Sequence, residues 1–392
     1  MELAIIPMFS SRFHWDLRPN RISQAIEAKR RSGTHLLDLT QSNPTRAGLE
    51  YPREILRAFE DERILVYDPA PAGARQAREA VAAYYASRSC TVQAEHILLT
   101  ASTSEAYAYL FKLLCNPGDH VLVPRPSYPL FEFLANLESV EVSQYPLTYY
   151  GGWGIDVGAV AAAVTGRTRA LVLVNPNNPT GSYLKRDELS QLEELCAARG
   201  LALISDEVFA DFSLRVDPAR VRTLVGVEGC LAFSMSGLSK IAGLPQMKLG
   251  WIVVSGPTGL RQPAKEKLEW IADTYLSVST PVQCAAARLF LAGEAVQRQI
   301  RERCEQNLAF AREMLAGSAM NLLDVEGGWY ITLQAPRIRS QEEWVLELIE
   351  RDGVLVQPGF FYDFASEAFL IVSLLTEGAV FREGLKRLVS SL

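Results

Sequence analysis

Metal-ligating residues are scarce in this chain and are not grouped. Its 392 residues include only four histidines, and its six cysteines are scattered without C-x-x-C spacing. The histidines are His14, His35, His96 and His120, and the cysteines are Cys90, Cys115, Cys196, Cys230, Cys284 and Cys304. This pattern predicts no metal site, and it predicts reduced thiols in a reducing compartment.

The chain also lacks the marks of a membrane protein or a nucleic-acid-binding protein. No run approaches 18 apolar residues, and residues 1–7 have no basic region before their short apolar run. The net charge is −6, acidic and basic residues are interspersed, and no basic patch alternates with aromatic residues. We therefore predict a cytoplasmic protein with no membrane partner and no nucleic-acid partner.

What the chain does have is an alternation of short apolar runs and amphipathic helical stretches. Apolar residues make up 48% and charged residues 21%, as in a soluble globular protein, and the length predicts two domains. Several runs are continuously apolar, as buried parallel strands are. Seven strands are predicted, at 97–100, 120–124, 140–144, 170–174, 201–205, 231–234 and 251–254. Helical patterns at 102–115, 185–199 and 263–272 indicate βαβ units of an α/β fold.

Two long helical patterns follow in residues 281–315, and shorter strand and helix signals continue to Leu392. We predict a large domain over residues 46–295. Residues 296–392 are predicted to form a smaller domain, with residues 1–45 as an N-terminal arm and part of that smaller domain.

Lys240 stands among small residues between two apolar, strand-like runs, 230–236 and 249–254. Most lysines are solvated surface charges. These flanks instead predict burial, and a buried ammonium needs a partner or loses its proton. A neutral amine can condense with an aldehyde to form a Schiff base. Lys240 is therefore a candidate attachment point, provided that the rest of the chain supplies a site.

Two loops after predicted strands carry polar groups in patterns that suit a ligand. Residues 100–106 lead into a helix through hydroxylated residues, which suits phosphate, although Ser102 and Glu105 also have the spacing of an ordinary capping box. Residues 175–181 read Asn-Pro-Asn-Asn-Pro-Thr-Gly, and their X-Pro steps hold the asparagines at a strand's carboxyl end, where α/β proteins bind ligands. The alternative for this second loop is a plain turn.

Asp206 closes another apolar run and is expected to be partly desolvated at the carboxyl edge of the sheet. A carboxylate in that position needs a cationic partner. Two partners remain open. One is a protonated ring nitrogen of a ligand, and the other is a neighbouring arginine or lysine.

Taken in order, these motifs resemble those of the class I/II aminotransferases, the aspartate aminotransferase superfamily of pyridoxal-phosphate (PLP) enzymes. The resemblance covers nearly the whole chain, and it implies PLP fold type I. This is an α/β fold with a mostly parallel seven-stranded sheet flanked by helices, plus a smaller α+β domain. The matching segments are 38–44, 67–73, the Ser102 loop, 126–129, 175–181, 206–207, the Lys240 segment, 327–330 and 358–359.

The resemblance implies a role for each matching residue. Lys240 would hold PLP as a Schiff base and move a proton during catalysis, and Asp206 would keep the pyridine nitrogen protonated. Asn178 would donate to the phenolic oxygen of the ring, and Tyr128 would stack on the ring. The phosphate would be bound by Ser102, Thr103, Ser104, Ser236, Ser239 and Lys248. In the family, the tyrosine that matches Tyr67 reaches the phosphate from the partner subunit, so a homodimer is implied.

Three positions near the implied cofactor depart from the family pattern. Phe209 replaces a tyrosine, which removes one donor to the phenolic oxygen and costs about 1–2 kcal/mol. Lys248 replaces the phosphate-binding arginine and supplies a point charge where the arginine has a planar fork. Gln246 replaces a small residue.

The largest departure is Ile371, which occupies the position of the arginine that clamps the α-carboxylate of the substrate. Arg12, Arg18 and Arg46 are the candidates for a substitute cation. An apolar pocket is expected from Ile371, Trp329, Phe360 and Phe361, the alternative being that these residues belong to the core of the small domain. The candidate substrate-binding residues are Asn43, Trp329, Ile371 and Arg12.

We predict a PLP-dependent aminotransferase that moves an amino group between an amino acid or amine and a keto acid. The alternative is another PLP-dependent reaction on the same fold, catalysed by a lyase, a decarboxylase or a biosynthetic cyclase. A non-catalytic module of PLP fold, such as the sensor half of a transcription regulator, is less favoured. An inert descendant has no physical need for Lys240, Asp206 and Asn178 together.

Overall fold

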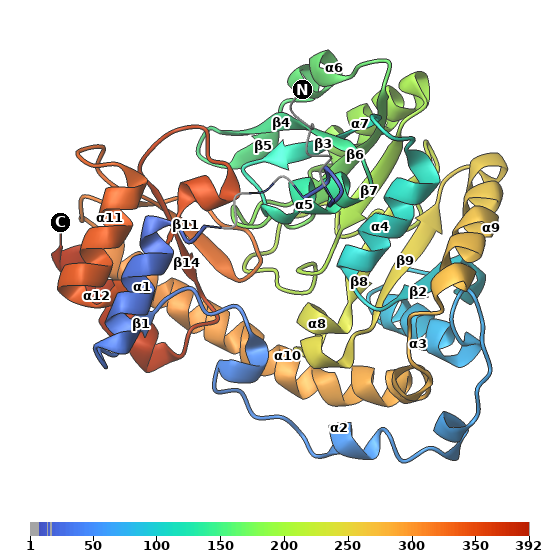
Figure 1. The fold of residues 1–392 in the computed structure, drawn as a ribbon, viewed down its shortest axis with the longest axis horizontal. Helices are drawn as coiled ribbons and strands as arrows, with labels where there is room; N and C mark the ends of the chain where they lie inside the picture. Colours follow the sequence, from blue (N-terminus) through green and yellow to red (C-terminus); the bar gives the residue numbers. More distant parts are fainter. Residues whose placement is uncertain (1–7, 14, 16–17, 392) are drawn as a thin grey trace, which may run out of the picture.

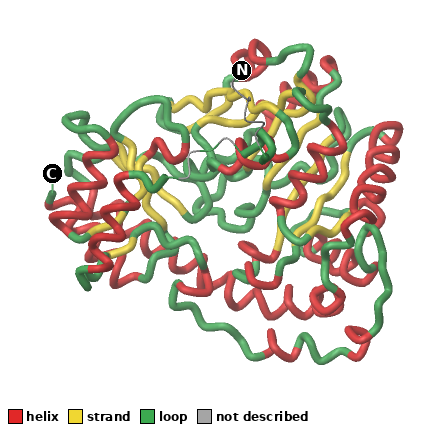
Figure 2. The backbone as a smooth tube through the Cα atoms, in the orientation of Figure 1, coloured by secondary structure: helices red, strands yellow, loops and turns green. Residues whose placement is uncertain are grey.

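The computed structural model describes residues 8–13, 15 and 18–391, so residues 1–7 and His14 lie outside the described residues. Its largest element is a sheet of eight strands between layers of helices (Figures 1 and 2). The strands are β2 Ile97–Thr100, β3 His120–Arg125, β4 Glu141–Tyr149, β5 Trp153–Ile155, β6 Thr168–Val174, β7 Ala202–Asp206, β8 Ala232–Gly237 and β9 Gly250–Ser255. Their order across the sheet is β2-β9-β8-β7-β6-β3-β4-β5.

The predicted mostly parallel α/β sheet is confirmed, with one error in the strand count. The run from β8 to β4 is parallel, while β9 is antiparallel to both of its neighbours and β5 is antiparallel to β4. All seven predicted strands are present. The eighth strand, β5, has three residues centred on Gly154, too short for a periodic signal, and it pairs with the part of β4 beyond residue 144.

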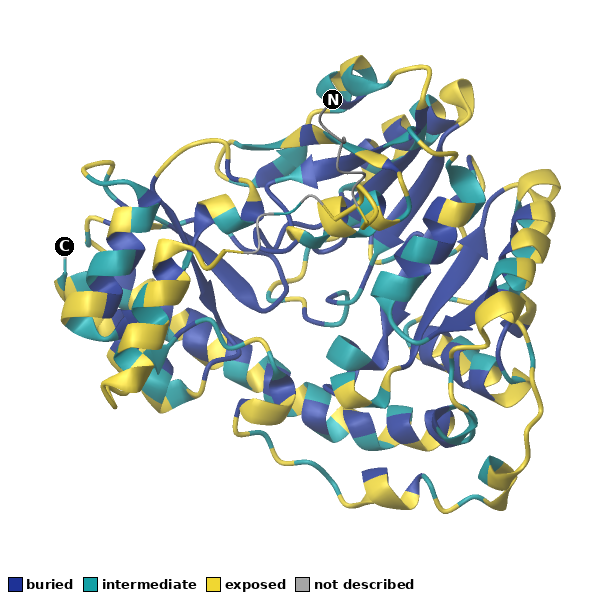
Figure 3. Ribbon diagram, viewed as in Figure 1, coloured by how far each residue is buried: buried dark blue, intermediate teal, exposed yellow. Residues whose placement is uncertain are grey.

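Figure 3 shows that the strands of the large sheet are mostly buried. Alternate residues of each strand face two helical layers, as the period of two requires. Ala170 and Val172 pack with one layer, and Leu171 and Leu173 pack with the other. The first layer is α4 Thr103–Leu114, α5 Leu130–Leu137 and α9 Thr258–Tyr275. The opposite face is covered by α3 Arg75–Ala86, α6 Val157–Ala163 and α7 Arg186–Arg199, together with the short helices α2 Glu54–Arg57 and α8 Leu238–Ile241.

Two helix predictions in the second half of the chain are wrong, one in its bounds and one in the number of helices. Helix α9 begins five residues before Pro263, which therefore lies inside the helix. The two patterns predicted in 281–315 form one 36-residue helix, α10 Thr280–Leu315. Gly293 does not interrupt this helix. It allows α10 to pack closely on α8, because a Cβ at this position would lie only 2.5 Å from Cβ of Ala242, the residue after α8.

Helix α10 spans two hydrophobic cores. At 36 residues it is about 54 Å long. Its first half packs with α3 and β9 through residues such as Leu289, and from Val296 onward it packs into a second core around β11 Tyr330–Gln334 and β14 Phe369–Ser373. The predicted boundary between residues 295 and 296 falls where α10 changes core, but the helix continues through it. The division into domains stays a prediction.

The second core surrounds a small antiparallel sheet with strand order β10-β11-β14-β13. Here β10 is Asn321–Leu322 and β13 is Gln357–Pro358, and the helices against this sheet are α1 Arg21–Arg31, α11 Gln341–Glu347 and α12 Gly378–Ser390. The N-terminal strand β1 Leu37–Asp38 pairs in parallel with β12 Val354–Leu355. Lys29 Nζ also donates to the carbonyl of Glu350 at 2.8 Å. The N-terminal segment therefore packs on the C-terminal part of the chain.

The remaining regular elements are single helical turns. They are η1 Pro44–Arg46, η2 Glu62–Leu65, η3 Ala94–His96, η4 Pro245–Met247, η5 Leu348–Asp352 and η6 Gly359–Tyr362. Within the described ranges, no helix combines the length and apolarity needed to cross a bilayer. The same part of the chain contains no cluster of three or more histidine, cysteine or acidic side chains arranged to hold a metal.

Candidate active site

The candidate residues gather at the carboxyl edge of the large sheet, where β6, β7 and β8 end side by side. Val174 pairs with Asp206 across β6 and β7, and the amide of Asn175 donates to the carbonyl of Asp206 at 2.8 Å. Lys240 lies in α8, the single helical turn that follows β8 directly. The segments that follow β6, β7 and β8, which carry Asn178, Asp206 and Lys240, therefore meet at one edge, as parallel βαβ topology requires.

Lys240 lies between aromatic rings and is only partly exposed. Its Nζ is 5.0 Å from the centroid of Trp329 and 5.7 Å from that of Phe209. Burial lowers the pKa of Lys240 to about 8, against the opposing effect of the negative charge of Asp206. The neutral fraction of this amine near neutral pH is therefore larger than that of a solvated lysine.

Asp206 has hydrogen-bond donors but no ionic partner among the described residues. The hydroxyl of Tyr107 donates to Oδ2 at 3.3 Å, and the amide of Val208 donates to Oδ1 at 3.2 Å. Burial raises the pKa of Asp206 to about 6, although these donors and Lys240 act in the opposite direction. The sequence left open a neighbouring arginine or lysine as the partner of Asp206, but neither forms a salt bridge with it within the described residues.

The asparagines of the 175–181 loop divide into structural and unpartnered groups. Asn175 Oδ1 accepts from the amide of Leu184 at 3.0 Å, and Asn177 Oδ1 accepts from Ser127 Oγ at 2.9 Å. Asn178 is buried, and its Oδ1 has no hydrogen-bond partner within the described part of the chain. A plain turn accounts for the first two side chains and leaves the third unexplained.

The loop before α4 is both a helix cap and an open helix N-terminus. Ser102 Oγ accepts from the amide of Glu105 at 3.2 Å, so the capping alternative is realised for this hydroxyl. The first-turn amides of Thr103 and Ser104 have no acceptor within the helix. Gly250 brings this loop against β8, because a Cβ at Gly250 would lie 3.1 Å from the carbonyl carbon of Ser102 and 3.2 Å from the carbonyl oxygen of Ser236.

The other predicted cofactor residues differ in how they are placed. Ser236 is buried, and its Oγ donates to the carbonyl of Glu207 at 3.4 Å. Ser239 lies in α8 next to Lys240 and is partly exposed, whereas Lys248 is exposed with φ of 52°. Tyr128 follows β3, and burial together with the charge of Asp206 raises its pKa. Tyr67 is 77% exposed, in the loop before α3.

The predicted substrate residues are mostly occupied in local contacts. Ile371 and Trp329 are fully buried in the core around the small sheet, as the alternative to an apolar pocket requires, although Trp329 also approaches Lys240. Asn43 Oδ1 accepts from the amide and the hydroxyl of Thr45. Arg12 Nη1 donates to the carbonyl of Leu137, at the end of α5, at 3.0 Å.

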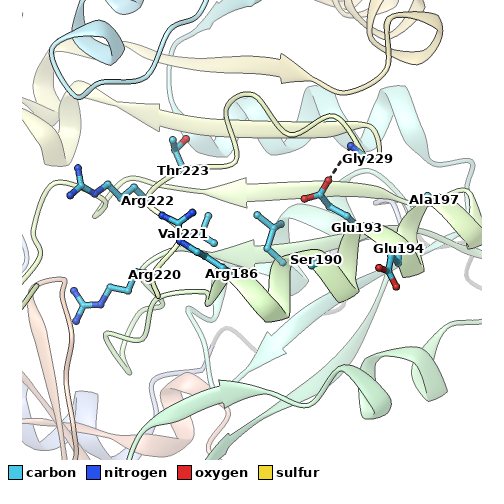
Figure 4. A pocket seen from close by; sticks show the side chains of 11 residues that line it. Arg186, Ser190, Glu193, Glu194, Ala197, Arg220, Val221, Arg222, Thr223 and Gly229 are labelled. Atoms are coloured by element: carbon cyan, nitrogen blue, oxygen red, sulfur yellow. Dashed lines mark hydrogen bonds between the residues drawn. The ribbon is translucent and has the colours of Figure 1, made fainter. Parts of the chain in front are cut away.

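A surface cavity of about 640 Å³ lies elsewhere, against α7 (Figure 4). Arg186, Arg220 and Arg222 line it, and on its far side Glu193 accepts from the amide of Gly229 at 3.0 Å. None of the predicted site residues lines this cavity. We therefore do not treat this cavity as a candidate active site.

Comparison with known proteins agrees with the geometry. Residues 34–388 match the family model described as aminotransferase class I and II. The chain belongs to this family.

Among curated relatives of this aminotransferase family member, the glutamate-pyruvate aminotransferase of Escherichia coli K12 is 29% identical over 273 residues. That match covers 66% of this chain and 65% of the relative, so it spans less than two thirds of the relative's length. The Haemophilus influenzae glutamate-pyruvate aminotransferase is 25% identical over 381 residues, covering 92% and 91%. A Thermus thermophilus aspartate aminotransferase structure superposes with a TM-score of 0.85 at 23% identity, covering 99% and 100%, which shows the shared fold.

Sequence reasoning missed one residue of the site in this aminotransferase family member. Tyr107 lies one turn into α4 and donates to Asp206. A signal was present, because α4 starts at the same sheet edge as Asp206 and a buried tyrosine hydroxyl seeks a partner. The pairing itself depends on how α4 crosses the sheet, which no local pattern encodes.

Proposed function

We propose that the protein is a PLP-dependent aminotransferase that transfers an amino group between an amino acid or amine and a keto acid. The observation that carries this proposal is the set Lys240, Asp206 and Asn178. It comprises a partly buried amine with a lowered pKa, a carboxylate without an ionic partner, and a buried asparagine whose side chain makes no hydrogen bond within the described residues, so that its Nδ2 is free to donate. An aldehyde, a protonated ring nitrogen and a phenolic oxygen on one ring would satisfy all three.

Each residue then has a definite task. Lys240 would hold the cofactor through its ε-amine and would move a proton at the substrate carbon. The amides of Thr103 and Ser104, with Ser239 and the charge of Lys248, bind the phosphate. When bound, PLP supplies an electron sink that stabilises negative charge at the substrate carbon. Phe209 contributes a ring beside Lys240 and no hydroxyl, so Asn178 is left as the donor to the phenolic oxygen.

A second candidate is another PLP-dependent reaction, by a lyase, a decarboxylase or a cyclase. The observation that favours it is the buried isoleucine at position 371 on β14. Without an arginine there, the substrate can be oriented differently over the ring, and the orientation selects the bond that breaks. Formation of a keto acid separates transamination from these alternatives.

A half-reaction screen tests the proposed function. The holoenzyme is mixed with single amino acids and simple amines, and the loss of the cofactor's aldehyde-form absorbance is followed together with keto acid release. We expect conversion by apolar amino acids or amines, and slower conversion by aspartate and glutamate, because the apolar Ile371 stands on β14 where the family has its carboxylate-binding arginine. A strong preference for aspartate contradicts this expectation. If no donor at all is converted, the proposal of transamination fails.

We also propose that the enzyme is a cytoplasmic homodimer in which Tyr67 reaches the phosphate of the partner's site. Tyr67 is exposed, as are its neighbours Leu65 and Val66. An apolar exposed stretch of this kind is typical of an interface. The free state of all six cysteines supports a reducing compartment. Analytical ultracentrifugation of the holoenzyme is expected to give a dimer, and a monomer at micromolar concentration contradicts this arrangement.

A further inference from the structure

The small sheet carries a row of three side chains at the place where the family has its carboxylate-binding arginine. Ile371 on β14 lies directly opposite Gln357 on β13 and directly opposite Thr332 on β11. Residues that pair across antiparallel strands point to the same face of the sheet. Gln357 and Thr332 therefore flank the side chain of Ile371, one on each side. Thr332 Oγ1 is buried and has no hydrogen-bond partner in the described part of the chain.

This face of the small sheet borders the site that holds Asp206. The amide of Ser127 donates to the carbonyl of Tyr362 at 3.0 Å, which ties the loop of Tyr128 to η6, the turn between β13 and β14 of the small sheet. Burial raises the pKa of Tyr330 and of Tyr362, and the nearby Tyr128 adds to both shifts. Tyr330 lies two residues before Thr332 and so shares its face. Tyr128 in turn interacts electrostatically with Asp206.

Tyr362 determines which end of the Gln357 amide is available. The hydroxyl of Tyr362 donates to Gln357 Oε1. With Oε1 engaged, the free group is the Nε2 amine with its two N–H donors. Gln357 remains partly exposed, and no hydrogen bond within the described ranges uses its Nε2.

We propose that Gln357, with its amide oriented by Tyr362, takes the place of the missing arginine and binds an oxygen of the amino donor next to the reacting carbon. This inference rests on the proposed function. A guanidinium selects an ionised carboxylate, whereas a neutral amide donates to a carboxylate or to the carbonyl oxygen of an amide or ester. The substrate class is therefore the α-amino carbonyl compounds, whether charged or neutral at the carbonyl.

Three donors and three variants test this assignment. The donors are the apolar amino acid converted fastest in the half-reaction screen, its primary amide, and the amine that lacks the carboxyl group. We expect the wild-type holoenzyme to show half-saturation values for the first two within about tenfold of each other. The variant Gln357→Leu is expected to raise both values by about tenfold to a hundredfold, because it removes a hydrogen bond to a polar or charged group of the donor. The value for the amine is expected to stay within about twofold.

The other two variants separate recognition from folding. Tyr362→Phe keeps the amide but releases it, so a smaller rise in the same two values is expected. Gln334→Leu makes the same exchange on the same sheet, opposite Phe369, and is expected to leave all three donors unchanged. A Gln357→Leu variant that weakens all three donors equally, or none, overturns the assignment. If the wild-type enzyme reacts with none of the donors, the proposed function is overturned instead.

Discussion

The variant Lys240→Ala is expected to lose all covalent attachment of PLP. Lys240 combines a lowered pKa of about 8 with a place beside Asp206 at the edge of the sheet, and alanine removes the amine that would attack the aldehyde. Wild-type and variant proteins are incubated with PLP, reduced with borohydride and compared by intact mass and peptide mapping. Turnover is expected to fall by at least about 10²–10⁴-fold, the usual contribution of a positioned general base.

The matched control is Lys248→Ala, which removes an exposed lysine from the same segment. It is expected to keep the reducible adduct on the peptide that contains Lys240, with weaker binding of the cofactor. A Lys240→Ala protein that still acquires one reducible adduct per chain would remove the central role assigned to this residue.

The pH dependence of attachment gives an independent check on Lys240. Only the neutral amine attacks an aldehyde, so the initial rate of attachment is expected to rise with pH through a midpoint near 8. A solvated lysine would give a midpoint near 10.4. The negative charge of Asp206 raises the pKa of Lys240, so Asp206→Asn is expected to move the midpoint to lower pH. A midpoint near that of a solvated lysine contradicts the burial on which the argument depends.

Continuously apolar runs made the fold of the large sheet predictable. A run such as 170–174 has to be buried on both faces, and in an α/β alternation this leaves a parallel strand covered by helices. β5 was missed because its three residues show no period and its pairing with β4 is decided by the neighbouring chain. The single helix α10 was missed because Gly293 weakens a helical pattern locally, while its close contact with Ala242 forms only in the folded molecule.

The site was predictable to the extent that its residues follow strands directly. Asp206 and Asn178 take their positions from the register of β6 and β7, and Lys240 takes its position from β8, so sequence order alone brings them together. The roles of Arg12 and Ile371 do not follow from order. Arg12 donates to α5, and Ile371 lies in the core, because tertiary packing decides which face such a side chain meets. Gln357 escaped notice since its significance depends on lying opposite Ile371 across two strands.

Replacing Asp206 with asparagine is expected to separate stability from activity. The pKa of Asp206 is raised from 3.8 to about 6, so the folded protein binds this proton more tightly than the unfolded chain does. The stabilisation by protonation of Asp206 is fully present below pH 3.8 and is lost as the pH rises through about 6. At pH 8 the carboxylate is therefore a buried charge that opposes folding. Two pKa units correspond to about 3 kcal/mol. As an upper bound, Asp206→Asn should stabilise the cofactor-free protein at pH 8 by that amount, which denaturant unfolding measures.

The same substitution is expected to lower turnover by several orders of magnitude while PLP remains attached to Lys240. Asparagine matches the size of aspartate and keeps one side-chain oxygen, which can accept from the amide of Val208 while its Nδ2 faces the hydroxyl of Tyr107, an oxygen that can also accept. It cannot hold a proton on the ring nitrogen, however, and an unprotonated pyridine is a poor electron sink. Tyr107→Phe is the matched control, because it removes a donor to Asp206 without removing the charge, and it should cost far less activity. Turnover of Asp206→Asn within tenfold of the wild type would show that the carboxylate has no such role, and that the raised pKa of Asp206 reflects burial alone.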